Sequence, residues 1–147
     1  MATRSPVLDQ INVVVGDMAA STEFYRRLGL EIPDSHPGWG KHHVEADLPD
    51  GLDMDLDSPV FAQQWNQGWA RNRKGLVIGF RLESRDDVDA RYPELTEAGY
   101  KGLQPPYDAF WGARYAVIED PDGNAVGMMS PSDPRHQRPP PDPNNLG

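Results

Sequence analysis

The chain opens with alternating apolar and polar residues and continues with apolar residues at helical spacing. Residues 8–15 are predicted as a strand, because its apolar positions mostly alternate with polar ones. A helix follows, in which Asp17 can cap the first turn and Gly29 can end the last one. The residues predicted on the buried face of this helix are Ala20, Phe24 and Leu28.

Shorter strands follow the helix, and a long connection separates them from the second half of the chain. These strands are predicted at 30–32, 41–48 and 51–57, with a loop at 33–40 and a turn at Pro49-Asp50-Gly51. The connection spans 58–74. Within it Phe61, Trp65 and Trp69 recur at four-residue spacing, which predicts a short amphipathic helix.

The same order of elements then recurs. The predicted elements are a strand at 75–83, a helix from 85 to about 98 that Ser84 caps and Pro93 kinks, a strand at 100–103, a loop at 104–111 and a hairpin at 112–129. Gly29 and Gly99 end corresponding helices, and Gly51 and Gly123 lie in corresponding turns. Both pairs have an offset of about 70 residues, which indicates an internal duplication.

Composition narrows the classes of partner. The net charge is −9 over 147 residues, and an acidic domain repels the phosphate backbone of nucleic acids. Without cysteine the chain has no disulfides and no thiolate sites. No apolar run is long enough for a membrane span and no signal peptide is recognisable, so we expect a soluble cytoplasmic protein. The acidity favours a cationic ligand, although it can equally serve solubility.

The C-terminal hairpin carries the most specific motif. Its turn is Asp120-Pro121-Asp122-Gly123-Asn124, in which Pro presets φ and Gly supplies a positive φ. This turn resembles the signature of the vicinal-oxygen-chelate superfamily, which holds glyoxalase I, extradiol dioxygenases and bleomycin-resistance proteins. The helix end Phe24-Tyr25…Leu28-Gly29-Leu30 and the segment Trp111-Gly112-Ala113-Arg114 extend the resemblance, which covers residues 7–131.

The resemblance implies the fold. It implies an α+β domain of two βαβββ modules that form one cupped mixed β-sheet, with the helices on the outer face. Module one is placed at 7–57, the connection at 58–74 and module two at 75–131. Residues 1–6 are expected to be a flexible N-terminus, and 132–147 a Pro-rich tail that is disordered or lies over the surface. Short members of this superfamily usually dimerise, so a homodimer is expected.

The resemblance also implies where a metal would bind. Metal-using members donate ligands from the first and last strand of each module, and the corresponding positions are Gln10, Asp55, Val77 and Gly127. Valine and glycine offer no donor atom, and catalytic zinc sites normally have three protein ligands. We therefore expect no metal cofactor, and the chain looks closest to the metal-free bleomycin-resistance branch.

Alternation along the strands assigns the two faces of the sheet. The apolar face, predicted to pack on the helices, holds Ile11, Val13, Val15, Leu76, Ile78, Phe80 and Leu82. The cup face is predicted to hold Gln10, Asn12, Gly75, Val77, Gly79 and Arg81, together with His43, Glu45, Asp53 and Asp55. The alternative for the acidic strand is an edge whose carboxylates face water and block pairing.

Aromatic residues gather in the two irregular connections. Phe110 and Trp111, flanked by Pro, Asp and Gly, suit a pocket rim, whereas Trp65 and Trp69 suit either a ligand wall or a hydrophobic core beneath their own helix. The predicted ligand-binding residues are Gln10, Asn12, His43, Glu45, Asp55, Trp65, Trp69, Phe110, Trp111 and Arg114.

These residues support three hypotheses of function. The first is a metal-free small-molecule binding protein, such as one that confers antibiotic resistance by sequestering a planar or cationic drug. The second is a divalent-metal-dependent lyase or dioxygenase with a displaced site, which needs at least three converging ligands from Gln10, His43, Glu45 and Asp55. The third is metal-free acid–base catalysis by Glu45, Asp55 or His43.

Overall fold

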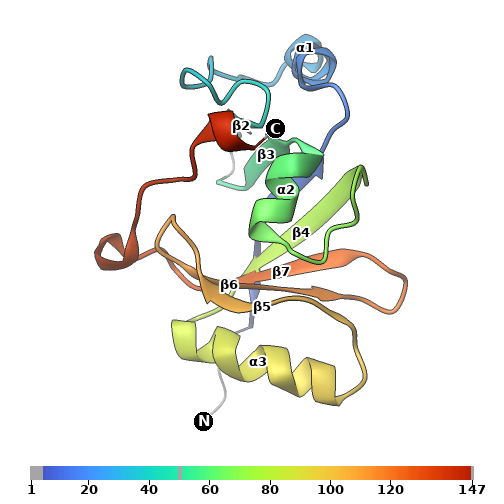
Figure 1. Cartoon of the computed structure of the whole chain (residues 1–147), viewed down its shortest axis with the longest axis vertical. Coiled ribbons are helices and arrows are strands. Elements are labelled where there is room, and N and C mark those ends of the chain that lie inside the picture. Colours follow the sequence, from blue (N-terminus) through green and yellow to red (C-terminus); the bar gives the residue numbers. More distant parts are fainter. Residues whose placement is uncertain (1–4, 50, 147) are drawn as a thin grey trace.

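The computed structural model describes residues 5–49 and 51–146 and contains one seven-stranded mixed sheet (Figure 1). Part of the predicted N-terminal segment, 1–4, and Asp50 of the predicted turn lie outside the described residues. The strands are β1 Val7–Val14, β2 His43–Ala46, β3 Asp53–Asp57, β4 Gly75–Arg81, β5 Gly102–Asp108, β6 Arg114–Glu119 and β7 Ala125–Met129. The helices are α1 Met18–Leu28, α2 Pro59–Trp65 and α3 Arg85–Glu97, with short 3₁₀ turns at Pro134–His136 and Pro143–Asn145.

The order of the strands confirms the predicted duplication and the α+β class. It runs β2-β3-β1-β4-β7-β6-β5. In each module the first strand pairs in parallel with the last one, β1 with β3 and β4 with β7. The two modules meet where β1 and β4 pair antiparallel in the middle of the sheet. One continuous sheet therefore carries both modules.

Two predicted strand boundaries are wrong. The strand expected at 30–32 is reduced to a single bridge between Glu31 and Asp47, and Pro33, which has no N–H to donate, follows directly. The loop expected at 104–111 is instead mostly strand, since β5 continues through Pro105 and Pro106 to Asp108. A strand tolerates these prolines because β5 is an edge strand, and its register shifts at two points there.

The predicted caps of the helices are confirmed. The Asp17 side chain accepts a hydrogen bond from the Ala20 N–H, and the Ser84 side chain accepts one from the Asp87 N–H. Gly29 ends α1 with a φ of 116°, in the left-handed region that glycine tolerates. In the part of the chain that the structure describes, no helix is both long and apolar enough to cross a membrane.

Helices α1 and α3 cover the outer face of the sheet, one on each module (Figure 1). The core under α3 consists of Leu82, Val88, Ala116, Ile118 and Met128, and the core under α1 of Val15, Met18, Ile32, Val44, Ala46 and Leu56. The predicted buried face of α1 is wrong. Phe24 and Leu28 are 60% and 66% exposed, because α1 turns Met18 and Tyr25 to the core instead. Leu76, also predicted to be covered, is 57% exposed.

A third core lies on the opposite, inner face of the sheet. Helix α2 packs there against module two, with Trp65 and Trp69 buried among Val77, Tyr115 and Val117. Module two therefore has no open inner face at these positions, and the cup is confined largely to the strands of module one.

The C-terminal tail follows the inner side of the molecule. Trp111 forms an isolated bridge with Gln137, and the Arg138 N–H donates to the Phe110 carbonyl. Leu146 is buried in the same core as α2, and Figure 1 shows the end of the tail beside α2 and β3. The proline-rich composition predicted disorder or a path along the surface. The tail follows the surface and is held by contacts at Gln137, Arg138 and Leu146.

Candidate functional site

The floor of the cup is a polar patch on β1, β2 and β3. The strand register places Asn12 and Glu45 on either side of Asp55, and His43 opposite Asp57. All of these side chains lie on the inner face, because residues two apart along a strand point the same way. The sheet thus gathers residues that are far apart in sequence onto one surface.

His43 is held by a buried carboxylate. Its Nδ1 lies 2.6 Å from Oδ1 of Asp57 and its Nε2 lies 3.2 Å from Oε1 of Glu45. Asn12 donates from Nδ2 to the other oxygen of Asp57 at 2.9 Å, and the Asp57 side chain is only 1% exposed. Burial lowers the pKa of His43, but the hydrogen bond and the charge of Asp57, with smaller contributions from Asp55 and Glu45, raise it to about 9. The ring is therefore a cation at neutral pH.

Asp55 sits beside this pair in a different electrostatic state. Gln10 donates from Nε2 to Oδ2 of Asp55 at 2.9 Å. Burial, followed by the charge of Asp57, raises the pKa of Asp55 to about 7, although the His43 cation opposes the rise. Asp55 and Asp57 are two residues apart on β3, but Asp57 pairs with the His43 ring whereas Asp55 accepts from Gln10.

Aromatic side chains wall the space above this floor. The cavity has a volume of about 700 Å³. Its aromatic lining consists of Trp39, Phe61, Trp65, Phe110, Trp111 and Tyr115. The rings meet edge to face, as between Trp39 and Phe61 with centroids 5.1 Å apart and between Trp111 and Tyr115 at 5.5 Å. Ser132 and Pro140 of the tail complete the wall.

Most residues predicted to bind a ligand line this cavity. They are Gln10, Asn12, His43, Glu45, Asp55, Trp65, Phe110 and Trp111. Trp69 does not, since it is 1% exposed in the core beneath α2 and its indole N–H donates to the Arg73 carbonyl at 2.8 Å. For Trp69 the core alternative is the one that the structure follows.

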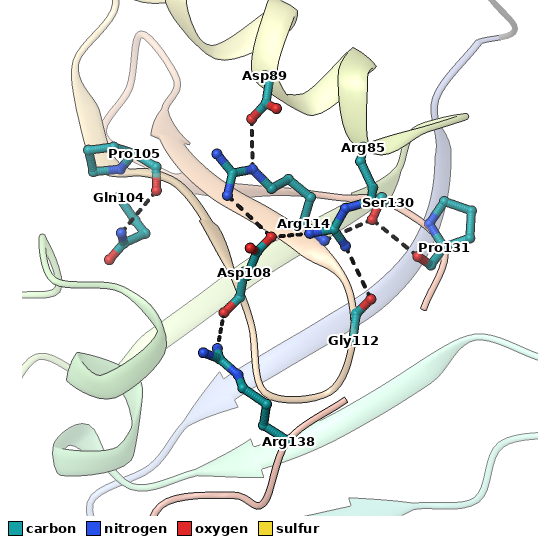
Figure 2. A network of polar contacts seen from close by, with 10 residues as sticks. All are labelled: Arg85, Asp89, Gln104, Pro105, Asp108, Gly112, Arg114, Ser130, Pro131 and Arg138. Carbon is teal, nitrogen blue, oxygen red and sulfur yellow. Dashed lines mark hydrogen bonds and ion pairs between the residues drawn. The ribbon is translucent and has the colours of Figure 1, made fainter. Parts of the chain in front are cut away.

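Arg114 also lies away from the cavity. Tyr115 points to the cup, so its neighbour Arg114 points to the outer face, where Nε donates to Asp89 of α3 at 2.7 Å. Figure 2 shows Arg114, Arg85 and Arg138 converging on Asp108 at the end of β5. Arg85 also donates to the Gly112 carbonyl at 3.3 Å. This network connects the two ends of the loop 109–113, which carries Phe110 and Trp111.

Several further residues of the cup were missing from the sequence-based set, among them Trp39, Asp57, Phe61 and Tyr115. Asp57 continues the alternation of Asp53 and Asp55 on β3, so the same period could have placed it on the floor. No local pattern marks Trp39 or Tyr115, because their place in the cup depends on a loop path and on the pairing of β6 with β7.

The superfamily's metal positions do not fit a metal here. Val77 is fully buried against α2. At Gly127 an added Cβ would lie 2.8 Å from the Tyr115 hydroxyl oxygen and 3.1 Å from the ring, so the Tyr115 side chain fills the space that a ligand at 127 needs. Val77 and Gly127 therefore offer no donor atom, and at Gly127 the Tyr115 side chain also leaves no room for one. A different group, His43, Glu45 and Asp55, has one donor atom per residue within 4.8 Å of the others.

Comparison with known proteins assigns the chain to a family. A family model described as the glyoxalase/bleomycin resistance protein/dioxygenase superfamily matches residues 7–128. The chain belongs to this superfamily. No curated protein matches the chain. The predicted superfamily is therefore confirmed, whereas its metal-free branch stays a prediction.

Several solved structures share the fold of this chain at low sequence identity. A superfamily member from Vibrio splendidus 12B01 is 15% identical with a TM-score of 0.58, over 86% of this chain and all of that chain (100%). A methylmalonyl-CoA epimerase from Streptomyces coelicolor is 24% identical with a TM-score of 0.53, over 88% and 100%. An extradiol ring-cleaving dioxygenase from B. fuscum is 18% identical with a TM-score of 0.60, over 90% of this chain and 35% of that one. These similarities support the fold of this chain and show nothing further about it.

Proposed function

We propose that the protein binds a planar cationic small molecule in the cup, without a metal, and protects the cell by sequestering it. The observation that carries this proposal is an acidic floor beneath aromatic walls in one cavity of about 700 Å³. That volume is within the usual range for small-molecule sites. A bleomycin-resistance-like role in antibiotic resistance is the form of sequestration that the superfamily suggests.

The charges on the floor favour a cation. Five carboxylates besides Asp55 line the cavity, at Asp34, Glu45, Asp47, Asp53 and Asp57. Arg26 pairs with Asp34 at 3.4 Å, and the His43 cation offsets one more of these charges. Glu45 is 74% exposed at its side chain, so its charge is available to an incoming ligand. Low-dielectric aromatic walls on one side strengthen the attraction relative to bulk water.

The walls favour a planar ligand. Trp111 and Phe110 belong to the loop between Asp108 and Arg114, whose ends the arginine network connects. Trp39 and Phe61 lie next to His43. A flat aromatic cation can stack on such rings and gain a cation–π interaction of about 0.5–2 kcal/mol. A saturated cation of the same size loses the stacking, and a planar anion loses the cation–π interaction.

Quenching of tryptophan fluorescence tests this proposal with two planar probes of opposite charge. We expect acridine orange, a cation, to bind one per chain, and anthracene-9-carboxylate, an anion, to bind at least tenfold more weakly. Glu45→Gln should weaken binding of the cation by about fivefold, because it removes one floor charge. Trp111→Ala should weaken binding of both probes.

The control for charge is Asp86→Asn. Asp86 is an exposed carboxylate on α3, on the outer face, so its loss changes the net charge equally without touching the cup. Acridine orange should bind this variant as it binds the wild type. Equal affinity for cation and anion, or equal losses in the Glu45 and Asp86 variants, would contradict the proposal.

Acid–base catalysis is a second candidate, and one contact favours it. His43 is oriented by Asp57, which Asn12 holds in turn, and an imidazole oriented by a carboxylate is common in enzymes that move protons. The test is deuterium incorporation from D₂O into a panel of 2-oxo acids and thioesters, followed by NMR. Incorporation that His43→Gln abolishes would support catalysis, and its absence across the panel would count against it.

A further inference from the structure

Three side chains on the floor of the cup converge from two strands. Glu45 of β2 and Asp55 of β3 are direct partners across the strand pair, and His43 precedes Glu45 by two residues on the same face. One ring nitrogen and one carboxylate oxygen from each acid lie within 4.8 Å of one another. That spacing allows all three to reach a single ion.

The ring of His43 is already oriented for such an ion. Asp57 engages Nδ1 at 2.6 Å, and Asn12 fixes the second oxygen of Asp57 at 2.9 Å. The remaining nitrogen, Nε2, is thereby directed at Glu45, 3.2 Å away. A histidine that binds a metal almost always donates its other N–H to a carboxylate or carbonyl in this way, which fixes the tautomer and the ring plane.

We propose that the cup floor also binds one divalent transition-metal ion, through Nε2 of His43 and one carboxylate oxygen each of Glu45 and Asp55, with release of the Nε2 proton of His43 to solvent. Asp57 is the positioning residue for the ring. The site shares only Asp55 with the superfamily's metal positions, since its other two ligands lie on β2 and since Gln10, Val77 and Gly127 take no part. Three protein ligands leave the coordination sphere open toward the cavity.

The ligand set indicates the kind of ion. One imidazole with two carboxylates suits Zn²⁺, Co²⁺ or Mn²⁺ better than Mg²⁺, which prefers oxygen ligands and keeps several waters. Such an ion needs the same Glu45 and Asp55 carboxylates that attract an organic cation. The inference therefore goes beyond the proposed function, because it predicts that the ion and the planar cation exclude one another.

Titration of the chelator-treated full chain with Co²⁺ and Zn²⁺ tests the site, by visible absorption of Co²⁺ and by calorimetry. We expect one ion per chain, tighter binding of Zn²⁺ than of Mg²⁺, and at least tenfold weaker binding in Glu45→Gln and Asp55→Asn. Glu45 is largely exposed, so its variant is expected to fold. Asp57→Asn should weaken binding by about 10–100-fold if Asp57 positions the ring.

Asp53→Asn is the matched control. Asp53 lies on the same strand and lines the same cavity, but it is not one of the three converging residues. The proposal is overturned if no ion binds saturably, or if the Glu45 and Asp55 variants bind ions no more weakly than the Asp53 variant does.

Acridine orange separates this inference from the proposed function. With the chelator present, dye binding depends on the proposed function alone; with the ion present, Zn²⁺ should raise the apparent Kd of the dye. Dye binding in a chain that takes up no ion would overturn the metal site only. Ion binding in a chain that takes up no dye would support the metal site and overturn the planar-cation proposal.

Discussion

Replacing Asp57 by alanine is expected to lower the free energy of unfolding by about 3–5 kcal/mol. The Asp57 carboxylate is buried, accepts from Asn12 and pairs with the His43 ring. Removing it leaves a partly buried cation and an amide without their partner, which costs more than the pair itself contributes. Urea-induced unfolding followed by circular dichroism measures the loss.

Asp53→Ala is the matched control for that variant. Asp53 lies on the same strand and the same face but is exposed, so its replacement should change the free energy of unfolding by about 0.5 kcal/mol or less.

In Asp57→Asn, which keeps the volume, NMR titration should show the pKa of His43 below its wild-type value of about 9, because Asp57 is the largest cause that raises it. An unchanged stability in Asp57→Ala would mean that the pair does not organise the floor.

Trp69→Ala is expected to lower the free energy of unfolding by a similar amount, about 3–5 kcal/mol. The indole is 1% exposed in the core between α2 and the inner face of the sheet, and Arg73 stacks over its ring at 4.5 Å from the centroid. Truncation would leave a large cavity that this tightly packed core cannot close, and would leave the Arg73 carbonyl without its donor. Thermal and urea unfolding measure the effect.

Val60→Ala, on the partly exposed side of α2, is the control and should cost about 1 kcal/mol or less. The milder Trp69→Phe should bind acridine orange as the wild type does, since Trp69 does not line the cavity. Trp111→Ala should show the reverse, with weaker dye binding and a smaller loss of stability. A loss of dye binding in Trp69→Phe would contradict the conclusion that Trp69 lies outside the ligand site.

The position of the candidate site follows from how module two is filled. Tyr115 occupies the space at Gly127, and α2 covers Val77, so the inner face of module two is closed at these two positions. The polar residues of β1, β2 and β3 are left as the open floor. Both candidate occupants, a planar cation and a divalent ion, are therefore placed on module one.

Local chemistry made much of the fold predictable. The Asp17, Ser84 and Gly29 caps and the turn at 120–124 act over a few residues, so composition and spacing alone marked them. The offset of about 70 residues between equivalent glycines likewise identified two modules, because a duplicated fold repeats its turns. The limits of the strands were harder to predict than the caps and turns. Pro105 and Pro106 lie within a strand because β5 is at the edge of the sheet, and the local sequence does not show that position.

The sequence by itself determined the two-module α+β architecture, the acidic inner face of β3 and the missing ligands at Val77 and Gly127, since each depends on residue type and on a period of two or about 70. Tertiary structure alone decided the site. Pairing across strands joins His43 to Asp57 and Glu45 to Asp55. Packing buries Trp69, turns Arg114 outward and fills Gly127 with Tyr115. Those outcomes depend on contacts between residues distant in sequence, which no local period encodes.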